Sequence, residues 1–184
     1  MMEGEKNLVD KARKGNSEAF GVLYDYYLPR IYRFVLFKVS HKQQAEDITQ
    51  HAFMKAWENV RRYKPQGHPF SSWIYRIARN SVIDYYRKGE SLVDIEEVSP
   101  EALGIDNSLI AKLEVKLEWE EVLGAINALS EVEQDVLIMR FVEDLPHEEV
   151  AKAVDKSENA VKVIQHRALK KLKGTLSKKW KRSI

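Results

Sequence analysis

The residues with the clearest chemical potential lie near the C-terminus, in the stretch SENAVKVIQHRALKKL, which runs from Ser157 to Leu172. From Asn159 to its last residue the chain carries many lysines and arginines and no acidic residue. On a helix that turns about 100° per residue, the apolar and cationic positions of this stretch fall in opposite arcs. The apolar arc holds Val161, Ile164, Ala168 and Leu172, and the opposite arc holds Asn159, Lys162, Val163, His166, Lys170 and Lys173, with Arg167 at its edge.

A cationic helix face of this kind suits a nucleic-acid groove, a membrane surface or solvent. A lysine-rich helix end often does no more than complement the helix dipole, and for the tail from Lys178 to Arg182 that alternative and a function are equally open. A membrane surface is disfavoured because the apolar arc is small and aliphatic. DNA is favoured by the preceding residues, because a short helix, a capped turn of about four residues and a longer helix form a helix-turn-helix.

In a helix-turn-helix, the N-terminal half of the second helix enters the major groove. The exposed residues of that half are therefore expected to meet base edges and neighbouring phosphates. Lys170 and Lys171, which follow, are expected to neutralise charge on the DNA backbone. The candidate DNA contacts of this helix are Ser157, Asn159, Lys162, Val163, His166, Arg167 and Lys170.

A second set of candidates lies in FSSWIYRIARNSVIDYYRK, where arginines alternate with aromatic residues. This composition suits stacking on unpaired bases and holding of their phosphates. The alternative, equally open on this segment alone, is that the tyrosines fill a small core and the arginines are solvated. The outward residues are Arg76, Arg79, Asn80 and Arg87, with Tyr75, Tyr85 and Tyr86 near them.

The segment AEDITQHAFMKAW predicts a helix with one outward face of mixed polarity. An exposed methionine among polar groups is commonly without function, but it also suits a protein-binding surface. Burial of Ile48, Ala52, Phe53, Ala56 and Trp57 would leave Glu46, Asp47, Gln50, His51 and Met54 outward.

No pattern in the chain indicates an enzyme. The absence of cysteine excludes disulfides, cysteine zinc sites and thiol nucleophiles. There is no glycine-rich phosphate loop, and no histidine pairs with a carboxylate at metal-ligand spacing. The histidines are scattered, at His41, His51, His68, His147 and His166. We expect no catalytic residue, no metal and no cofactor.

Charge is segregated along the chain, although the formal net charge is only +2. Residues 49–88 and 159–184 are basic, whereas residues 90–121 carry ten acidic residues against two lysines. Segregated charge is more informative than its sum. No apolar run has the length of a signal peptide or a membrane span, so we expect a soluble, intracellular protein without membrane insertion.

Apolar residues recur mostly at helical spacing in the first half of the chain. One helix is predicted over Ser17–Val39, with Pro29 kinking or dividing it. A second is predicted over Gln43–Tyr63. The prolines and glycine of KPQGHP, Lys64–Pro69, then predict a loop, and a third helix begins near Phe70.

Helical periodicity lapses from Gly89 to about Ser108, where an acidic composition with proline and glycine predicts a linker. Helices resume over 109–129. Ser130 with Glu133 predicts a capping box, and Pro146 is expected in the first turn of a short helix. Ser157 is predicted to cap the last helix. The chain is therefore predicted to be all-α, with helical domains over 1–88 and 113–184 joined by a flexible acidic linker over 89–112.

The segments AEDITQHAFMKAW, PFSSWIYRIARNSVIDYYRK, ALSEVEQDVLIMRFVEDLPHEEVAKAV and VKVIQHRALKKL together resemble the bacterial sigma factors of the extracytoplasmic-function (ECF) group. The resemblance runs from Ser17 to Leu172, with two motif blocks in the family's order around a linker that does not match. It implies an RNA polymerase subunit that directs promoter recognition and transcription initiation. Its two domains would correspond to sigma regions 2 and 4.

The resemblance also implies roles for particular residues and partners. Asp47, Gln50, His51 and Met54 would dock on the clamp helices of the polymerase largest subunit, and the second domain would contact the flap of the second subunit. The minus-10 promoter element would be captured and opened by Lys64, His68, Phe70, Arg76, Arg79, Asn80 and Arg87. Trp73 aligns with a family tryptophan, but its helical position points inward, so we expect it in the core. The minus-35 element would be recognised by the candidate contacts of the last helix. The linker would thread toward the active-site and RNA-exit channels of the polymerase. An anti-sigma factor would hold the protein inactive, and the protein would be cytoplasmic.

Three residues depart from the family pattern. His51 stands where an acidic residue is usual, and Asp155 stands where many turns use glycine, although aspartate tolerates the left-handed conformation. Val163 replaces a serine, which favours contact with a thymine methyl over a polar pair. The alternative function is a stand-alone helix-turn-helix regulator of duplex DNA. Such a regulator has no use for the arginine-aromatic helix and the KPQGHP loop.

Overall fold

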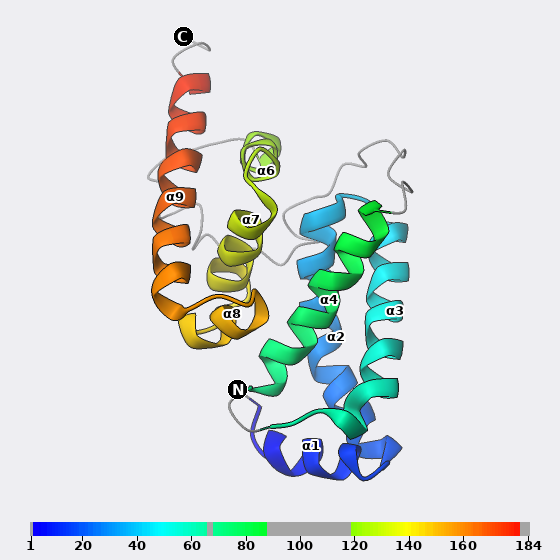
Figure 1. The fold of residues 1–184 in the computed structure, drawn as a ribbon. Helices are drawn as coiled ribbons and strands as arrows, with labels where there is room; N and C mark the ends of the chain where they lie inside the picture. The colour runs from blue at the N-terminus through cyan, green and yellow to red at the C-terminus, as the bar shows by residue number, and fades with distance from the viewer. Residues whose placement is uncertain (1, 66–67, 88–118, 181–184) are drawn as a thin grey trace. The chain divides into compact units, whose positions relative to one another are not determined.

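A computed structural model of the chain describes residues 2–65, 68–87 and 119–180 (Figure 1). Every regular element in these residues is a helix, which confirms the predicted class. No helix among them is apolar over a length that could cross a membrane. Contacts divide the chain into two compact units, Met1–Glu97 and Val98–Ile184, each described by itself below. The linker predicted over 89–112 and the helical start predicted over 109–118 lie outside the described residues, so the domain boundaries stay a prediction.

The first unit is a bundle of three long helices with a short helix at one end (Figure 1). The long helices are α2 (Ser17–Val39), α3 (Lys42–Asn59) and α4 (Phe70–Arg87), and each packs against the other two. The short helix α1 (Glu5–Arg13) packs against α2 and against the 3-10 turn η1 (Val60–Arg62) that follows α3. The hydrophobic pattern did not predict α1.

Polar caps set the limits of the long helices. The side chain of Asn16 begins α2 by accepting a hydrogen bond from the Ala19 N–H at 2.7 Å. Ser40 ends α2 in the left-handed conformation, with φ of 53°. His41 then begins α3, because its Nδ1 accepts from the Gln44 N–H at 3.3 Å. These caps place the start of α3 one residue before the predicted Gln43.

The core of the first unit forms around α2. Residues 34–37 of α2 are all buried, as are Phe20, Leu23, Tyr27 and Ile31, and both α3 and α4 pack against this helix. Phe34 meets Tyr75 of α4 edge-on, with ring centroids 5.5 Å apart. Pro29 was predicted to kink or divide this helix; it is exposed and α2 continues through it, so the helix is not divided. Trp57, predicted inward, packs on Phe20 but stays 39% exposed.

The second unit consists of short helices packed against one long helix (Figure 1). The short elements are α6 (Trp119–Asn127), α7 (Glu131–Leu137), the π-helical segment η2 (Ile138–Val142) and α8 (His147–Ala153). The long helix α9 (Glu158–Trp180) packs against α6, α7 and α8. The predicted helix-turn-helix corresponds to α8, the turn and α9.

The turn between α8 and α9 has the predicted geometry. It spans residues 154–157, and Asp155 has a φ of 57°, the left-handed conformation expected there. The Ala160 N–H donates to Ser157 Oγ at 3.2 Å, so Ser157 caps α9 as predicted. Pro146 lies one position earlier than expected. It is the N-cap of α8, in extended conformation, and the helix proper begins at His147.

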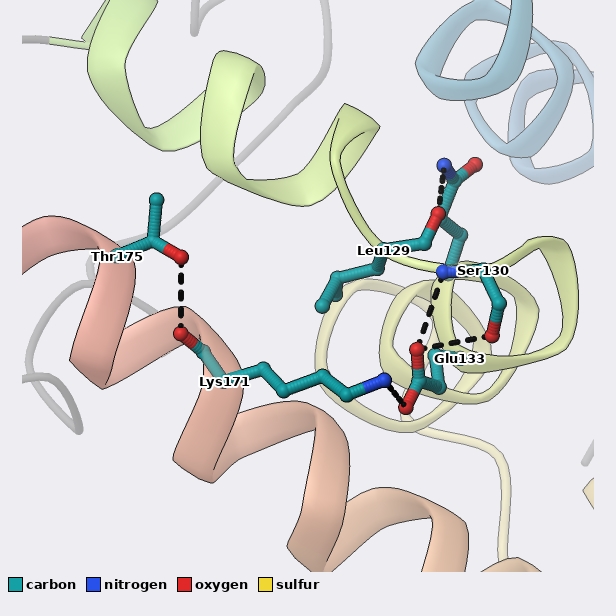
Figure 2. A network of polar contacts seen from close by, with 6 residues as sticks. Leu129, Ser130, Glu133, Lys171 and Thr175 are labelled. Atoms are coloured by element: carbon teal, nitrogen blue, oxygen red, sulfur yellow. Dashed lines mark hydrogen bonds and ion pairs between the residues drawn. The ribbon is translucent and has the colours of Figure 1, made fainter.

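One carboxylate joins α7 to α9 (Figure 2). Glu133 Oε2 accepts from the Ser130 N–H at 3.0 Å and from Ser130 Oγ at 2.8 Å, which confirms the predicted pairing of these residues. Glu133 Oε1 accepts from Lys171 Nζ at 2.6 Å. Burial acts to raise the pKa of Glu133, but the hydrogen bonds from Lys171 and Ser130 together outweigh it, and the pKa lies below its ordinary 4.5. The carboxylate therefore caps α7 and holds α9 against it.

Glu133→Ala is expected to lower the free energy of unfolding of the second unit by about 1–2 kcal/mol at neutral pH, because the cap and the link to α9 are lost together. Lys171→Met should cost less than about 1 kcal/mol, because the lysine is largely exposed. A lowered carboxylate pKa contributes stability that is present above the ordinary 4.5 and lost as the pH falls through the folded value. Urea unfolding measured across that range checks this. Parallel pH profiles for the wild type and Glu133→Ala would contradict it.

Candidate nucleic-acid interface

The exposed side of α9 collects the residues predicted to contact DNA. Each of them lies exposed, including Val163 at 48%, whereas Val161, Ala168 and Leu172 are completely buried on the opposite side. Ile164, predicted inward, is half-buried at the edge. We call the exposed set the α9 face. Its members are Ser157, Asn159, Lys162, Val163, His166, Arg167 and Lys170.

An acidic residue sits at the leading end of the α9 face. Glu158 Oε1 forms an ion pair with Lys162 Nζ at 2.7 Å, and both side chains are about half-exposed. The hydrogen bond from Lys162, and then its charge, hold the pKa of Glu158 below the ordinary value. Nothing in the apolar pattern pointed to this pair, although the four-residue spacing of Glu and Lys is the signal that could have found it.

Two further contacts fix the orientation of α9. His147 Nε2, at the start of α8, lies 2.8 Å from Gln165 Oε1. Lys171 belongs to the ion pair with Glu133. Lys171 was expected to neutralise DNA charge alongside Lys170; its amine pairs with Glu133 while its side chain stays 59% exposed, so that expectation stays a prediction.

The first unit contains a pocket of about 410 Å³ between the end of α3, η1 and α4. A pocket of this size can accept a small planar group. We call it the α3–α4 pocket. Two aromatic residues, two cations and two amides lie among its lining residues, which are Lys55, Asn59, Arg62, Tyr63, Trp73, Ile77, Asn80 and Asp84.

Aromatic rings build one wall of the α3–α4 pocket. Tyr63 and Trp73 have ring centroids 4.8 Å apart, and Phe70 lies behind them at 5.8 Å from Tyr63. Tyr63 Oη donates to the carbonyl of His68, which ties the loop after η1 to this wall. Burial, and next the carboxylate of Glu5, raise the pKa of Tyr63 to about 12, so the phenol keeps its proton at neutral pH.

The residues expected to capture the minus-10 element do not all lie together. Lys64 and His68 are exposed on the described part of the loop, and Asn80 lines the α3–α4 pocket. Arg87 is exposed and pairs with Asp84 at 3.1 Å. Arg76 and Arg79 are half-buried and already have interactions within the protein.

Two aromatic assignments change. Phe70, expected among the residues that capture the minus-10 element, is only 3% exposed and packs in the core. Trp73, expected in the core, is half-buried and lines the α3–α4 pocket. The sequence analysis missed the other pocket residues from α3 and η1, Lys55, Asn59, Arg62 and Tyr63. Their contribution depends on how α3 ends against α4, which periodicity does not show.

A third exposed surface lies on α3. Asp47, Gln50, His51 and Met54 are all exposed, Met54 at 61%, and we call them the α3 patch. The amide of Gln43 lies 3.4 Å from an Asp47 oxygen, a long hydrogen bond that leaves the carboxylate accessible. In the part of the chain that the structure describes, no group of three or more His, Asp or Glu side chains is placed to hold a metal ion.

Comparisons with known proteins match both units. The family description "Sigma-70 region 2" matches residues 23–91, and "Sigma-70, region 4" matches residues 125–174. The ECF RNA polymerase sigma factor BldN of Streptomyces coelicolor is 31% identical over 166 residues, which are 90% of this chain and 63% of BldN. This chain therefore spans less than two thirds of that relative.

Two other known proteins match this chain over most of its length and over most of their own length. The ECF RNA polymerase sigma factor SigD of Mycobacterium tuberculosis is 30% identical over 183 residues, which are 94% of this chain and 84% of SigD. The sigma factor RpoE, solved in complex with the anti-sigma factor NepR from Bartonella quintana, has a TM-score of 0.65 at 23% identity. That match covers 86% of this chain and 96% of RpoE, and it shows the shared fold.

Glu158→Gln is expected to raise the affinity of the full chain for duplex DNA about three- to fivefold at low salt. The variant removes a charge that repels phosphates and competes for Lys162. Fluorescence anisotropy with a labelled duplex, repeated over a salt series, measures it. Glu148→Gln is the matched control, because Glu148 forms the equivalent pair with Lys152 at 2.6 Å on α8. Equal changes in the two variants would contradict a specific role for Glu158.

Proposed function

We propose that this chain, which belongs to the extracytoplasmic-function group of the sigma-70 family, is a dissociable subunit that gives RNA polymerase its promoter specificity. It directs promoter recognition and transcription initiation. It acts by binding, and the bond-forming chemistry belongs to the polymerase. Its site of action is then the cytoplasm, where the polymerase is found.

The observation that carries this proposal is the presence, in separate units, of two different surfaces whose composition suits contact with DNA. The α9 face has the geometry of a helix that enters a major groove, so we assign it to the minus-35 element. The α3–α4 pocket combines aromatic rings and amides, which suit an unpaired base, with two cations, of which Lys55 is paired with Asp84 of the same pocket at 3.4 Å. We assign the pocket, with Lys64 and His68 at the loop beside it, to the minus-10 element.

The pocket also separates this proposal from its alternative. A stand-alone regulator reads paired bases in the grooves of duplex DNA and gains nothing from an aromatic pocket. An initiation factor must hold bases that have left the stack, and such bases are commonly held between aromatic side chains. The presence of Tyr63 and Trp73 on the pocket wall therefore supports the sigma factor.

Protein partners are assigned to the remaining surfaces. We assign the α3 patch to the clamp helices of the polymerase largest subunit, because it is exposed and combines charge with a flexible apolar residue. The second unit is assigned to the flap of the second subunit. RpoE of Bartonella quintana was solved with an anti-sigma factor, and we propose that this chain is held by one as well.

The direct test is transcription by core polymerase supplemented with the purified chain. Sequencing of the transcripts that appear when the protein is overproduced supplies the promoter. Transcripts from that promoter in the purified system, absent without the chain, are the expected result. A core enzyme that stays inert, with the chain still binding the duplex, would establish the regulator instead.

Substitutions on the α9 face are expected to weaken use of the minus-35 element. Arg167→Ala or Lys162→Ala should lower promoter binding by the holoenzyme about 5- to 100-fold, since a side chain that contacts bases contributes about 1–3 kcal/mol. Lys42→Ala is a charge-matched control, because Lys42 is exposed at the start of α3 in the other unit. Binding of holoenzyme to promoters with and without the minus-35 element measures the effect. Equal losses of binding on both promoters would exclude the assignment of the α9 face to the minus-35 element.

Substitutions in the first unit should separate DNA opening from polymerase binding. Asn80→Ala is expected to reduce opening about tenfold with little change in affinity for core polymerase, since it removes an amide from the pocket. Asp47→Ala should instead raise the dissociation constant for core polymerase, with little change in DNA opening by the bound protein. Arg79→Ala tests the half-buried arginine in the same assays. Competition for core polymerase and permanganate reactivity of unpaired thymines provide the two measurements. An Asn80→Ala variant that opens normally would remove the pocket from the minus-10 assignment.

A further inference from the structure

The short helix α1 carries a buried acidic residue at its start. Glu5 is 6% exposed, and its Oε2 accepts a hydrogen bond from Tyr27 Oη at 2.7 Å, with Tyr27 itself 3% exposed. A buried carboxylate is costly unless it is hydrogen-bonded, so this contact fixes the start of α1 on α2. None of the surfaces described above includes Glu5 or Tyr27.

Tyr27 connects this anchor to the α3–α4 pocket through packed rings. Its ring centroid lies 5.5 Å from that of Phe70, the first residue of α4. Phe70 in turn lies 5.8 Å from Tyr63 and 5.3 Å from Trp73, the two rings on the pocket wall. Because these rings are close-packed, a shift of Tyr27 must be taken up by the wall.

The other end of α1 holds η1. Gly15, just beyond the helix, has a φ of 92°, and a Cβ placed there would lie 2.9 Å from Arg61 Nη2. The guanidinium therefore rests directly on the backbone that leaves α1, where the negative end of the helix dipole favours a cation. Arg61 belongs to η1, whose next residue, Arg62, lines the pocket. The helix thus supports the pocket from two sides.

We infer that α1 is a positioning element for the α3–α4 pocket, with Glu5, Tyr27 and Gly15 as positioning residues for minus-10 recognition. The inference rests on the proposed function, because it takes the pocket to hold an unpaired base. A base is discriminated only when the groups around it are held closely in place by the residues behind them. Loss of an α1 anchor should therefore reduce discrimination between bases, and not only stability.

The test uses the full chain with core polymerase on its promoter and on variants with single base changes in the minus-10 element. Glu5→Ala and Tyr27→Phe are expected to reduce opening of the cognate promoter about five- to tenfold. They should also lower the ratio of opening on the cognate promoter to opening on the promoters with changed bases. Glu5→Gln keeps an oxygen that can accept a hydrogen bond from Tyr27, so its promoter opening and its discrimination ratio should both lie within about twofold of the wild type. Gly15→Ala meets the flexible end of Arg61 and strains a backbone with a φ of 92°, so it should loosen the junction of α1 with η1 and behave like Glu5→Ala.

A control separates positioning from loss of stability. Val35→Ala truncates a completely buried side chain of α2 that is outside the ring chain, and urea unfolding shows how closely its destabilisation matches that of Tyr27→Phe. Polymerase is kept saturating, so that only folded, bound protein is compared. Unchanged discrimination in Val35→Ala with reduced discrimination in Tyr27→Phe supports the inference. Equal ratios in all variants overturn it, while failure of the wild type to start transcripts would overturn the proposed function itself.

Discussion

Burial of one side of α9 against α6, α7 and α8 is the interaction on which the second unit depends. Val161, Ala168 and Leu172 supply that seam, and their burial leaves the cationic side no alternative but to face outward. Burial of apolar area is non-directional, so it turns the apolar side of α9 inward without setting the exact direction in which each side chain points. The polar contacts of Glu133 and His147 with α9 supply that direction.

The first unit needs a different kind of site, because it is proposed to bind an unpaired base, whereas α9 is proposed to enter the major groove of duplex DNA. A pocket needs walls from several elements, and here the end of α3, η1 and α4 provide them. The rings of Tyr63, Phe70 and Trp73 serve both core and pocket. The core and the proposed base site therefore share packed side chains in this unit, and this is why α1 can affect the pocket although it does not line it.

Periodicity and caps in the sequence predicted most helices and the exposed face of α9, because both depend on local spacing. Ser130, Asp155 and Ser157 act as predicted for the same reason. The α3–α4 pocket, the burial of Phe70 and the role of Lys171 escaped prediction because each depends on contacts between elements far apart in the chain. The helix α1 was missed because its apolar stripe is short, and its anchor is an acidic residue that patterns assign to the surface.

The charge arrangement of the second unit argues that this unit alone is not built to bind DNA tightly. Glu158 draws Lys162 into an ion pair at the leading end of the α9 face, and Lys171 is committed to Glu133. Fewer cations are then left for phosphates, and non-specific affinity falls with each one removed. Two weak sites become a strong one only when a scaffold holds them at the right separation, since the second contact is then intramolecular. Weak separate units joined on the polymerase would give a factor that rejects DNA when free and selects promoters when bound.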